Sequence, residues 1–216
     1  MTTRQTPFAL GEYYHLYSRG VDKRPIFLDQ NDKDRFVRLL FVCNGLKPIV
    51  YRDIKNLPLL SIETGEKIVA IGAYCLMSNH FHFLVREMKE GGTTKFMSKL
   101  LTAYSVYFNK KYKRAGALFG SEFKSKHLGS DEYLKYIFSY IHLNPVKNLD
   151  PDWRKNSLER VVVEQFLDNY QESSYLDYTH TQNREESCII NKLVFPEYFT
   201  NEGEFRDNLF EWFKPL

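Results

Sequence analysis

The sequence contains little cysteine and no long apolar run. Its three cysteines, Cys43, Cys75 and Cys188, stand far apart in a chain of 216 residues. An odd number at this spacing offers neither a disulfide framework nor a zinc motif, and it favours buried thiols in a reducing compartment. No stretch approaches the roughly 20 apolar residues that span a bilayer, and the first residues lack the apolar segment of a signal peptide. We therefore expect a cytoplasmic protein without a membrane partner.

The sequence also lacks internal repeats and low-complexity segments, which argues against a repeat protein. It does contain 43% apolar residues, including 17 Phe and 15 Tyr, which is enough for a packed core. We predict a main domain over residues 1–150 and an acidic, mostly helical extension over residues 151–216.

The net charge of +3 is unevenly distributed. Residues 1–94 carry 13 Lys and Arg against 10 Asp and Glu, residues 95–147 carry 10 against 3, and residues 148–216 carry 7 against 14. The differences are +3, +7 and −7, so a positive island precedes an acidic region. Such an island indicates a polyanionic partner, and a solvated helix face is the alternative reading.

The hydrophobic pattern alternates between strand and helix. Strands are predicted at residues 11–21, 67–77, 78–87 and 120–129, and helices at residues 31–46, 93–114 and 131–144. Ser78 and Asn79 turn the chain between two antiparallel strands, Thr93 or Thr94 caps the long helix, and the last helix stops near Pro145. The order β-α-β-β-α-β is that of an α+β, ferredoxin-like split βαβ fold with an antiparallel sheet and packed helices.

Two histidines stand one residue apart in "SNHFHFLV", residues 78–85. Side chains alternate along a strand, so His80 and His82 share one face. Two imidazoles side by side indicate a shared ligand, and two hydrogen-bonded core histidines are the alternative.

Tyr140 and Asn144 stand four residues apart on the last predicted helix and so project from one face. If that helix packs on the sheet, the Asn144 amide joins the two imidazoles around a divalent cation with open positions. A cation that polarises a phosphodiester allows the Tyr140 phenol to attack phosphorus. A packing role is the alternative for any tyrosine, and Tyr136 and Tyr133 are rival nucleophiles.

Four segments together resemble the single-tyrosine HUH transposases, most closely the REP-associated tyrosine transposases of the insertion-sequence 200-like type. They are "YHLYSRGVDKRPIF", "AYCLMSNHFHFLV", "FMSKLLTAYSVYFNKKYKRAGALFGSEFKS" and "YLKYIFSYIHLNPVK", which occur in matching order over about residues 10–150. The resemblance implies that His80 and His82 bind Mg²⁺ or Mn²⁺, that Asn144 completes the metal site, and that Tyr140 is the nucleophile. It implies an enzyme that cleaves and rejoins single-stranded DNA near hairpins through a covalent 5′-phosphotyrosine.

The positive island then becomes a candidate DNA-binding surface. Its cations could follow a phosphate backbone while aromatic rings stack on unpaired bases. The candidate residues are Lys110, Lys111, Lys113, Arg114, Lys124, Lys126, Tyr112 and Phe123. "ESSYLDY", residues 172–178, resembles an S-S-Y element that follows the catalytic helix in the REP-associated subgroup.

The other histidines are weaker candidates. His15 lies on the first strand, where packing is favoured over a place on the metal face. His127 follows the basic strand, where it could meet phosphate, His142 is assigned to core or surface, and His180 to a surface loop.

Two further functions stay open. One is a non-cleaving protein that binds hairpin DNA or RNA and keeps the histidine pair for its fold. The other is a metal-dependent phosphodiesterase that uses water in place of tyrosine. We expect a monomer or a homodimer.

Overall fold

The structure, a computed structural model, describes residues 7–156, 158–179 and 184–213. His180 lies outside the described residues. No described helix has the length and apolar character needed to cross a membrane.

Four strands form one antiparallel sheet in the order β2-β3-β1-β4. They are β1 (Tyr13–Arg19), β2 (Val69–Met77), β3 (His80–Glu87) and β4 (Lys124–His127). Ser78 and Asn79 join β2 to β3, as the sequence predicted. The predicted α+β fold is therefore confirmed.

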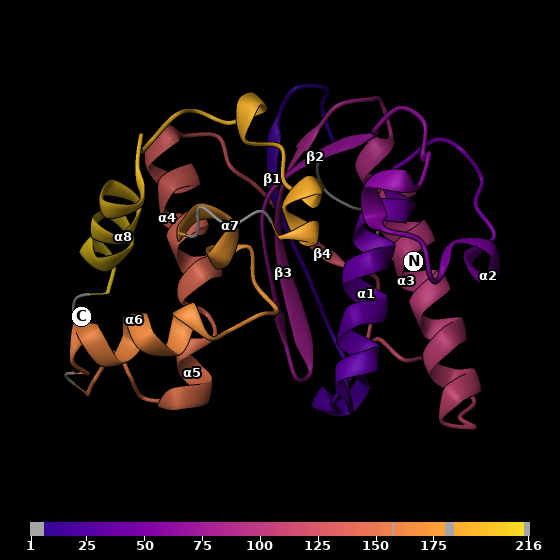
Figure 1. Cartoon of the computed structure of the whole chain (residues 1–216), viewed down its shortest axis with the longest axis horizontal. Helices are drawn as coiled ribbons and strands as arrows, with labels where there is room; N and C mark the ends of the chain where they lie inside the picture. Colours follow the sequence, from indigo (N-terminus) through magenta and orange to yellow (C-terminus); the bar gives the residue numbers. More distant parts are fainter. Residues whose placement is uncertain (1–6, 157, 180–183, 214–216) are drawn as a thin grey trace.

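Helices cover both faces of the sheet (Figure 1). One face packs against α1 (Gln30–Cys43) and α3 (Gly92–Lys111), and the other against α4 (Asp131–Leu143). The shorter helices are α2 (Tyr51–Ile54), α5 (Val146–Leu149), α6 (Arg160–Asp168), α7 (Tyr175–Thr179) and α8 (Glu202–Glu211). Single 3₁₀ turns occur at Val21–Lys23, Leu59–Ser61, Glu185–Ile189 and Lys192–Val194.

The prediction that Thr93 or Thr94 caps the long helix is wrong, because Gly91 occupies that position. Gly91 has a φ of 68°, in the left-handed region that glycine adopts without strain. Thr93 instead lies in the first turn of α3, where its backbone N–H and its hydroxyl donate to the buried carboxylate of Glu87. The threonine therefore ties α3 to the end of β3.

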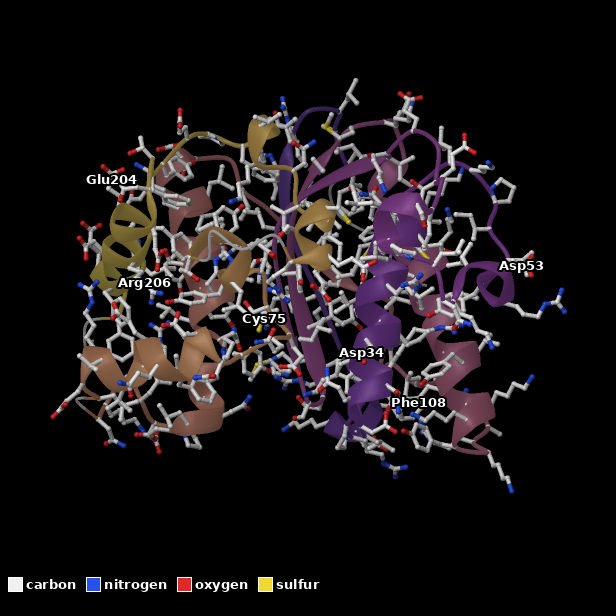
Figure 2. The ribbon with its side chains drawn as sticks, viewed as in Figure 1. Asp34, Asp53, Cys75, Phe108, Glu204 and Arg206 are labelled. Atoms are coloured by element: carbon white, nitrogen blue, oxygen red, sulfur yellow. The ribbon has the colours of Figure 1, made fainter. Side chains whose placement is uncertain are left out.

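The acidic extension packs against the sheet and α4. Leu76 of β2 donates its N–H to Glu172 O at 2.9 Å, and Ser174 donates to Tyr74 O at 3.0 Å. Residues of α6, α7 and α8 share a core with α4 on the same side of the sheet (Figure 1). Cys75, labelled in Figure 2, is fully buried in this core. The extension therefore follows the sheet in sequence, but it packs against the sheet in the fold.

Candidate active site

His80 and His82 lie on the face of the sheet that α4 covers. In the pairing of β3 with β1, His80 lies opposite Arg19 and His82 lies opposite Tyr17. Because side chains alternate along a strand, His15 of β1 projects from this same face. The fold thus gathers three imidazoles under α4.

Asn79 fixes the position of the proton on His80. The Asn79 Nδ2 donates to Lys23 O at 2.9 Å, so its Oδ1 is the atom that lies 2.6 Å from the His80 Nδ1. An amide oxygen only accepts hydrogen bonds, so the His80 Nδ1 carries the proton and donates it. The Nε2 of His80 therefore keeps a free lone pair.

His82 is held by His15. The His15 Nε2 lies 2.9 Å from the His82 Nδ1, and both side chains are buried. When His82 donates the hydrogen bond in this pair, the His82 Nε2 has a lone pair for a cation. When His15 donates it, the His82 Nε2 carries the proton. The sequence favoured a packing role for His15, and the structure places it beside the metal-binding candidates.

The three imidazoles are neutral at pH 7. Burial, with the positive charge of Lys126, lowers the pKa of His15 to about 4. Burial, with the nearby Arg19 and Lys147, lowers the pKa of His80 to about 4. Burial likewise holds the pKa of His82 well below its usual range. Neutral imidazole is the form that binds a metal ion.

α4 places Tyr140 over these rings. Its ring centroid lies 5.4 Å from that of His82 and 5.9 Å from that of His15, and both contacts are edge-to-face. Ser130 begins the helix by accepting a hydrogen bond from Tyr133 N at 3.3 Å. The Tyr140 hydroxyl has no hydrogen-bond partner in the part of the chain that the structure describes.

Asn144 is buried beside His80. Its side chain is 2% exposed, and within the described ranges neither its Oδ1 nor its Nδ2 makes a well-aligned hydrogen bond. It lies close enough to His80 to oppose the lowering of that imidazole's pKa. Although Pro145 follows, Asn144 keeps helical dihedrals of φ −57° and ψ −37°. A buried polar group without a good hydrogen bond destabilises the fold by about 1–3 kcal/mol. A ligand that binds the Asn144 amide would offset this free energy.

These residues fit a divalent cation. Two imidazole nitrogens with lone pairs and one amide oxygen suit Mn²⁺, and oxygen atoms of a substrate would extend the set toward the preference of Mg²⁺. Among the described residues, no group of three His, Cys, Asp or Glu side chains has an arrangement that could hold a metal ion by itself. A site here therefore depends on the amide and on oxygen atoms from outside the chain.

The rival tyrosines lie farther from the imidazoles along α4. Tyr136 lies one turn before Tyr140, with the two rings tilted and their centroids 6.1 Å apart, and it packs against Trp212 at 5.2 Å. Tyr133 stacks on Tyr136 at 6.2 Å, and the Lys126 Nζ lies 4.7 Å from its ring centroid. Of the three, Tyr140 is the one whose ring contacts His82.

The predicted DNA-binding residues divide between the two faces of the sheet. Lys124 and Lys126 lie opposite Tyr17 and His15 in the β1–β4 pairing, so they share the face of the imidazoles. The remaining candidates belong to α3 or to the segments that follow it: Lys110, Lys111, Lys113, Arg114, Tyr112 and Phe123.

Several of these remaining candidates are engaged within the fold. The Lys111 Nζ lies 2.7 Å from carboxylate oxygens of both Asp29 and Asp32. Tyr112 donates its hydroxyl to Asp32 at 2.8 Å. The ring of Phe123 packs partly against the core. The end of α3 is thus tied to the start of α1.

Two other histidines have partners in the protein. The His127 Nε2 lies 2.6 Å from the Glu12 carboxylate. His142 is fully buried, with its Nδ1 2.9 Å from Phe138 O and its Nε2 2.8 Å from the Ser174 hydroxyl. The S-S-Y element therefore docks on α4 through His142, which explains the element as a structural anchor.

Sequence reasoning missed three residues around the site. Asn79 orients His80, as described above. Arg19 follows His15 and Tyr17 on the same face of β1, a period of two that the sequence displays. Lys147 stands three residues after Asn144, and its Nζ lies 5.5 Å from the ring centroid of Tyr140.

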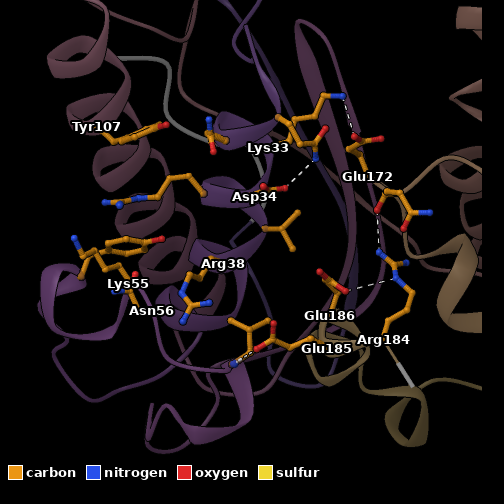
Figure 3. A pocket seen from close by; sticks show the side chains of 17 residues that line it. Lys33, Asp34, Arg38, Lys55, Asn56, Tyr107, Glu172, Arg184, Glu185 and Glu186 are labelled. Atoms are coloured by element: carbon orange, nitrogen blue, oxygen red, sulfur yellow. Dashed lines mark hydrogen bonds and ion pairs between the residues drawn. The ribbon is translucent and has the colours of Figure 1, made fainter. Parts of the chain in front are cut away.

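A separate cavity of about 520 Å³ lies between α1, α2 and residues 171, 172 and 184–186 (Figure 3). Its carboxylates are engaged: Glu172 pairs with Lys33 at 2.9 Å, and Glu186 lies 3.6 Å from Arg184. It contains none of the imidazoles or Tyr140. The chemistry of the site therefore belongs to the opposite face of the sheet.

The residues of this site lie in a segment that matches a known protein family. Residues 47–144 match the family described as "Transposase IS200 like", a segment that contains His80, His82, Tyr140 and Asn144. This match covers fewer than half of the residues of the chain and supports the resemblance of the motifs to the IS200-like transposases.

A solved structure is also similar to this chain. It is titled "Structure of the REP associates tyrosine transposase bound to a REP hairpin" and matches with a TM-score of 0.50 and 11% identity, over 86% of this chain and 90% of that chain. At this identity the likeness shows a shared fold. Comparison with curated proteins found no match.

Proposed function

We propose that this protein is a metal-dependent DNA strand transferase that cleaves and rejoins single-stranded DNA near a hairpin, with Tyr140 as its nucleophile. The observation that carries the proposal is the meeting of His82 with Tyr140, next to His80 and the buried Asn144 amide. A hairpin is the proposed DNA feature because a structure with this fold is described as bound to a REP hairpin.

His80, His82 and Asn144 would hold Mg²⁺ or Mn²⁺. When bound, the cation supplies a Lewis acid that polarises a phosphodiester and offsets its negative charge. Asn79 and His15 would hold the two imidazoles through their Nδ1 atoms and leave the Nε2 atoms to bind the cation. Preorientation of this kind lowers the entropic cost of bringing the reacting groups together.

Tyr140 performs the transfer. Its hydroxyl oxygen attacks phosphorus, and the bond from phosphorus to the 3′ oxygen of the preceding nucleotide breaks. The phenol gives its proton to water, and the departing 3′ oxygen takes one up. The product is a 5′-phosphotyrosine on Tyr140 and a free 3′ hydroxyl, and attack by a 3′ hydroxyl in the reverse direction rejoins the DNA.

The test uses hairpin-bearing single-stranded oligonucleotides, Mn²⁺ and denaturing gels. We expect wild-type protein to form a covalent adduct with the DNA. Tyr140→Phe removes one oxygen and keeps the packed ring, so it should bind metal and hairpin without forming the adduct. The matched control, Tyr136→Phe, should keep most of the activity.

The outcomes separate the alternatives. An adduct that persists in Tyr140→Phe and disappears in Tyr136→Phe would place the nucleophile one helical turn earlier. Cleavage by both variants without an adduct would make water the attacking group. Tight hairpin binding by wild-type protein without any cleavage would identify a binding protein.

A further inference from the structure

Three cations lie at one end of the candidate site. Arg19 is the last residue of β1 and lies opposite His80 in the sheet. Lys147 approaches the Tyr140 ring from α5, at 5.5 Å from its centroid. The positive charges of Arg19 and Lys147 both act on His80 and on His82, which places the two cations near these imidazoles.

Arg154 extends this group. Its guanidinium lies 4.7 Å from the ring centroid of Trp153, a side chain that is 3% exposed. Burial lowers the pKa of Lys147, and the positive charges of Arg154 and Arg19 lower it further. Strand β1, helix α5 and the following turn thus bring three like charges together.

No ion pair joins these three cations to a carboxylate in the described part of the chain. The nearby acids are engaged elsewhere: Asp150 accepts from Asn156 at 2.7 Å, and Asp152 pairs with Lys155 at 2.9 Å. Clustered like charges repel one another, which opposes folding unless an anion joins them. A cluster of this kind beside a nucleophile therefore indicates an anionic ligand.

We propose that Arg19, Lys147 and Arg154 form a phosphate subsite that holds a phosphodiester of single-stranded DNA next to Tyr140, an assignment that rests on the proposed function. Guanidinium groups bind phosphate oxygens through two parallel hydrogen bonds, and an ammonium group acts as a point charge. The subsite acts without metal, because its charges belong to the chain.

The subsite differs from the surface that the sequence predicted. That surface ran from the end of α3 to β4, whereas these three residues lie beyond the paired histidines, around the end of β1 and the start of the extension. Arg154 belongs to the extension, because the predicted main domain ends at residue 150. The subsite therefore connects the extension to the site. Residues of the extension therefore contribute to DNA binding through charge in addition to packing.

The test measures binding in EDTA, where cleavage does not occur. A fluorescent hairpin oligonucleotide with a single-stranded extension is titrated with wild-type protein, with Arg19→Gln/Lys147→Gln and with Lys55→Gln over a range of salt concentrations. Lys55 is an exposed lysine after α2, on the other side of the sheet, and it serves as the control. Melting temperatures confirm that each variant is folded.

Each neutralised phosphate contributes about 0.7 to the slope of log affinity against log salt for single strands. We expect the double variant to lose about 1 unit or more of this slope and roughly tenfold or more in affinity at low salt, with the control unchanged. A methylphosphonate scan of the extension should reveal one position where loss of the DNA charge weakens wild-type binding and leaves the double variant unaffected.

The results distinguish this proposal from the proposed function. Equal slopes and affinities for the wild-type protein and the double variant would overturn the subsite, whether or not the wild-type protein forms the adduct. A reduced slope in the double variant would support the subsite even if the wild-type protein never cleaves DNA. Wild-type protein that binds no single-stranded DNA in EDTA would overturn the subsite as well.

Discussion

The Nε2 of His15 lies 2.9 Å from the Nδ1 of His82, with both rings 5% exposed. The two residues are 67 positions apart and meet because β1 pairs with β3. A metal-binding imidazole commonly donates its other N–H to a fixed acceptor, which sets the orientation of the ring and the nitrogen that is free. His15 is placed to be that acceptor for His82.

We predict that His15→Leu weakens Mn²⁺ binding by about 10- to 100-fold, the usual effect of removing a partner that orients a ligand. His15→Gln should retain more of the affinity, because a carboxamide oxygen can accept the same hydrogen bond. Calorimetry on the protein without DNA measures this directly. Unchanged affinity in His15→Leu would mean that His15 has no role in orienting His82.

The lysines of the positive island should separate into two kinds. Lys124 and Lys126 share the face of the imidazoles, so their replacement by Gln should lower the salt dependence of DNA binding. Lys111→Gln should instead lower the free energy of unfolding, because it leaves the fully buried carboxylate of Asp32 without its cation. Urea unfolding and salt titration of both variants test this. A large loss of DNA binding with no loss of stability in Lys111→Gln would contradict the assignment.

Local pattern was sufficient for most of the fold. Alternation along β3 put His80 and His82 on one face, and helical spacing put Tyr140 and Asn144 on one face of α4. The structure confirms the fold class and the turn between β2 and β3 because both depend on nearby residues. The cap of α3 was predicted wrongly because Thr93 donates hydrogen bonds to the buried carboxylate of Glu87 at the end of β3. The local sequence pattern does not indicate this contact.

The rest of the site depends on distant pairings. The contact of His15 with His82 requires strand register, and that of His142 with Ser174 requires the extension to fold back on α4. Composition alone made the extension look separate, since most of its acidic residues are exposed or partly exposed while many of its aromatic side chains enter the core. Residues that meet only through tertiary packing leave no periodic signal in the sequence.

His142 should make stability depend on pH. Burial lowers its folded pKa to about 3, below the value of 6.5 that an unfolded histidine has. The unfolded chain therefore takes up the proton first, so the stabilisation from neutral His142 is complete above about pH 6.5 and is lost as the pH falls toward 3. One proton corresponds to a slope of about 1.4 kcal/mol per pH unit.

We predict that His142→Gln reduces stability at pH 7 but makes it less sensitive to acid. The difference in free energy of unfolding between wild-type protein and the variant should narrow steadily between pH 6.5 and pH 4.5. Urea unfolding at several pH values measures it, and the other titrating groups are common to both proteins. A difference that stays constant with pH would show that His142 is not held neutral by the fold.

Asn144 allows stability and metal binding to be separated. Its buried amide makes no well-aligned hydrogen bond among the described residues, so replacing it with an apolar side chain of similar size removes a desolvation cost. We predict that Asn144→Leu leaves the free energy of unfolding unchanged or raises it by about 1 kcal/mol or more, while Mn²⁺ affinity and adduct formation are lost. Asn144→Asp, which keeps an oxygen ligand and adds charge, should bind Mn²⁺ at least as tightly as the wild-type protein. A destabilised Asn144→Leu variant with unchanged Mn²⁺ binding would instead show that the amide has a structural partner and that the cation, if any, is held by other groups.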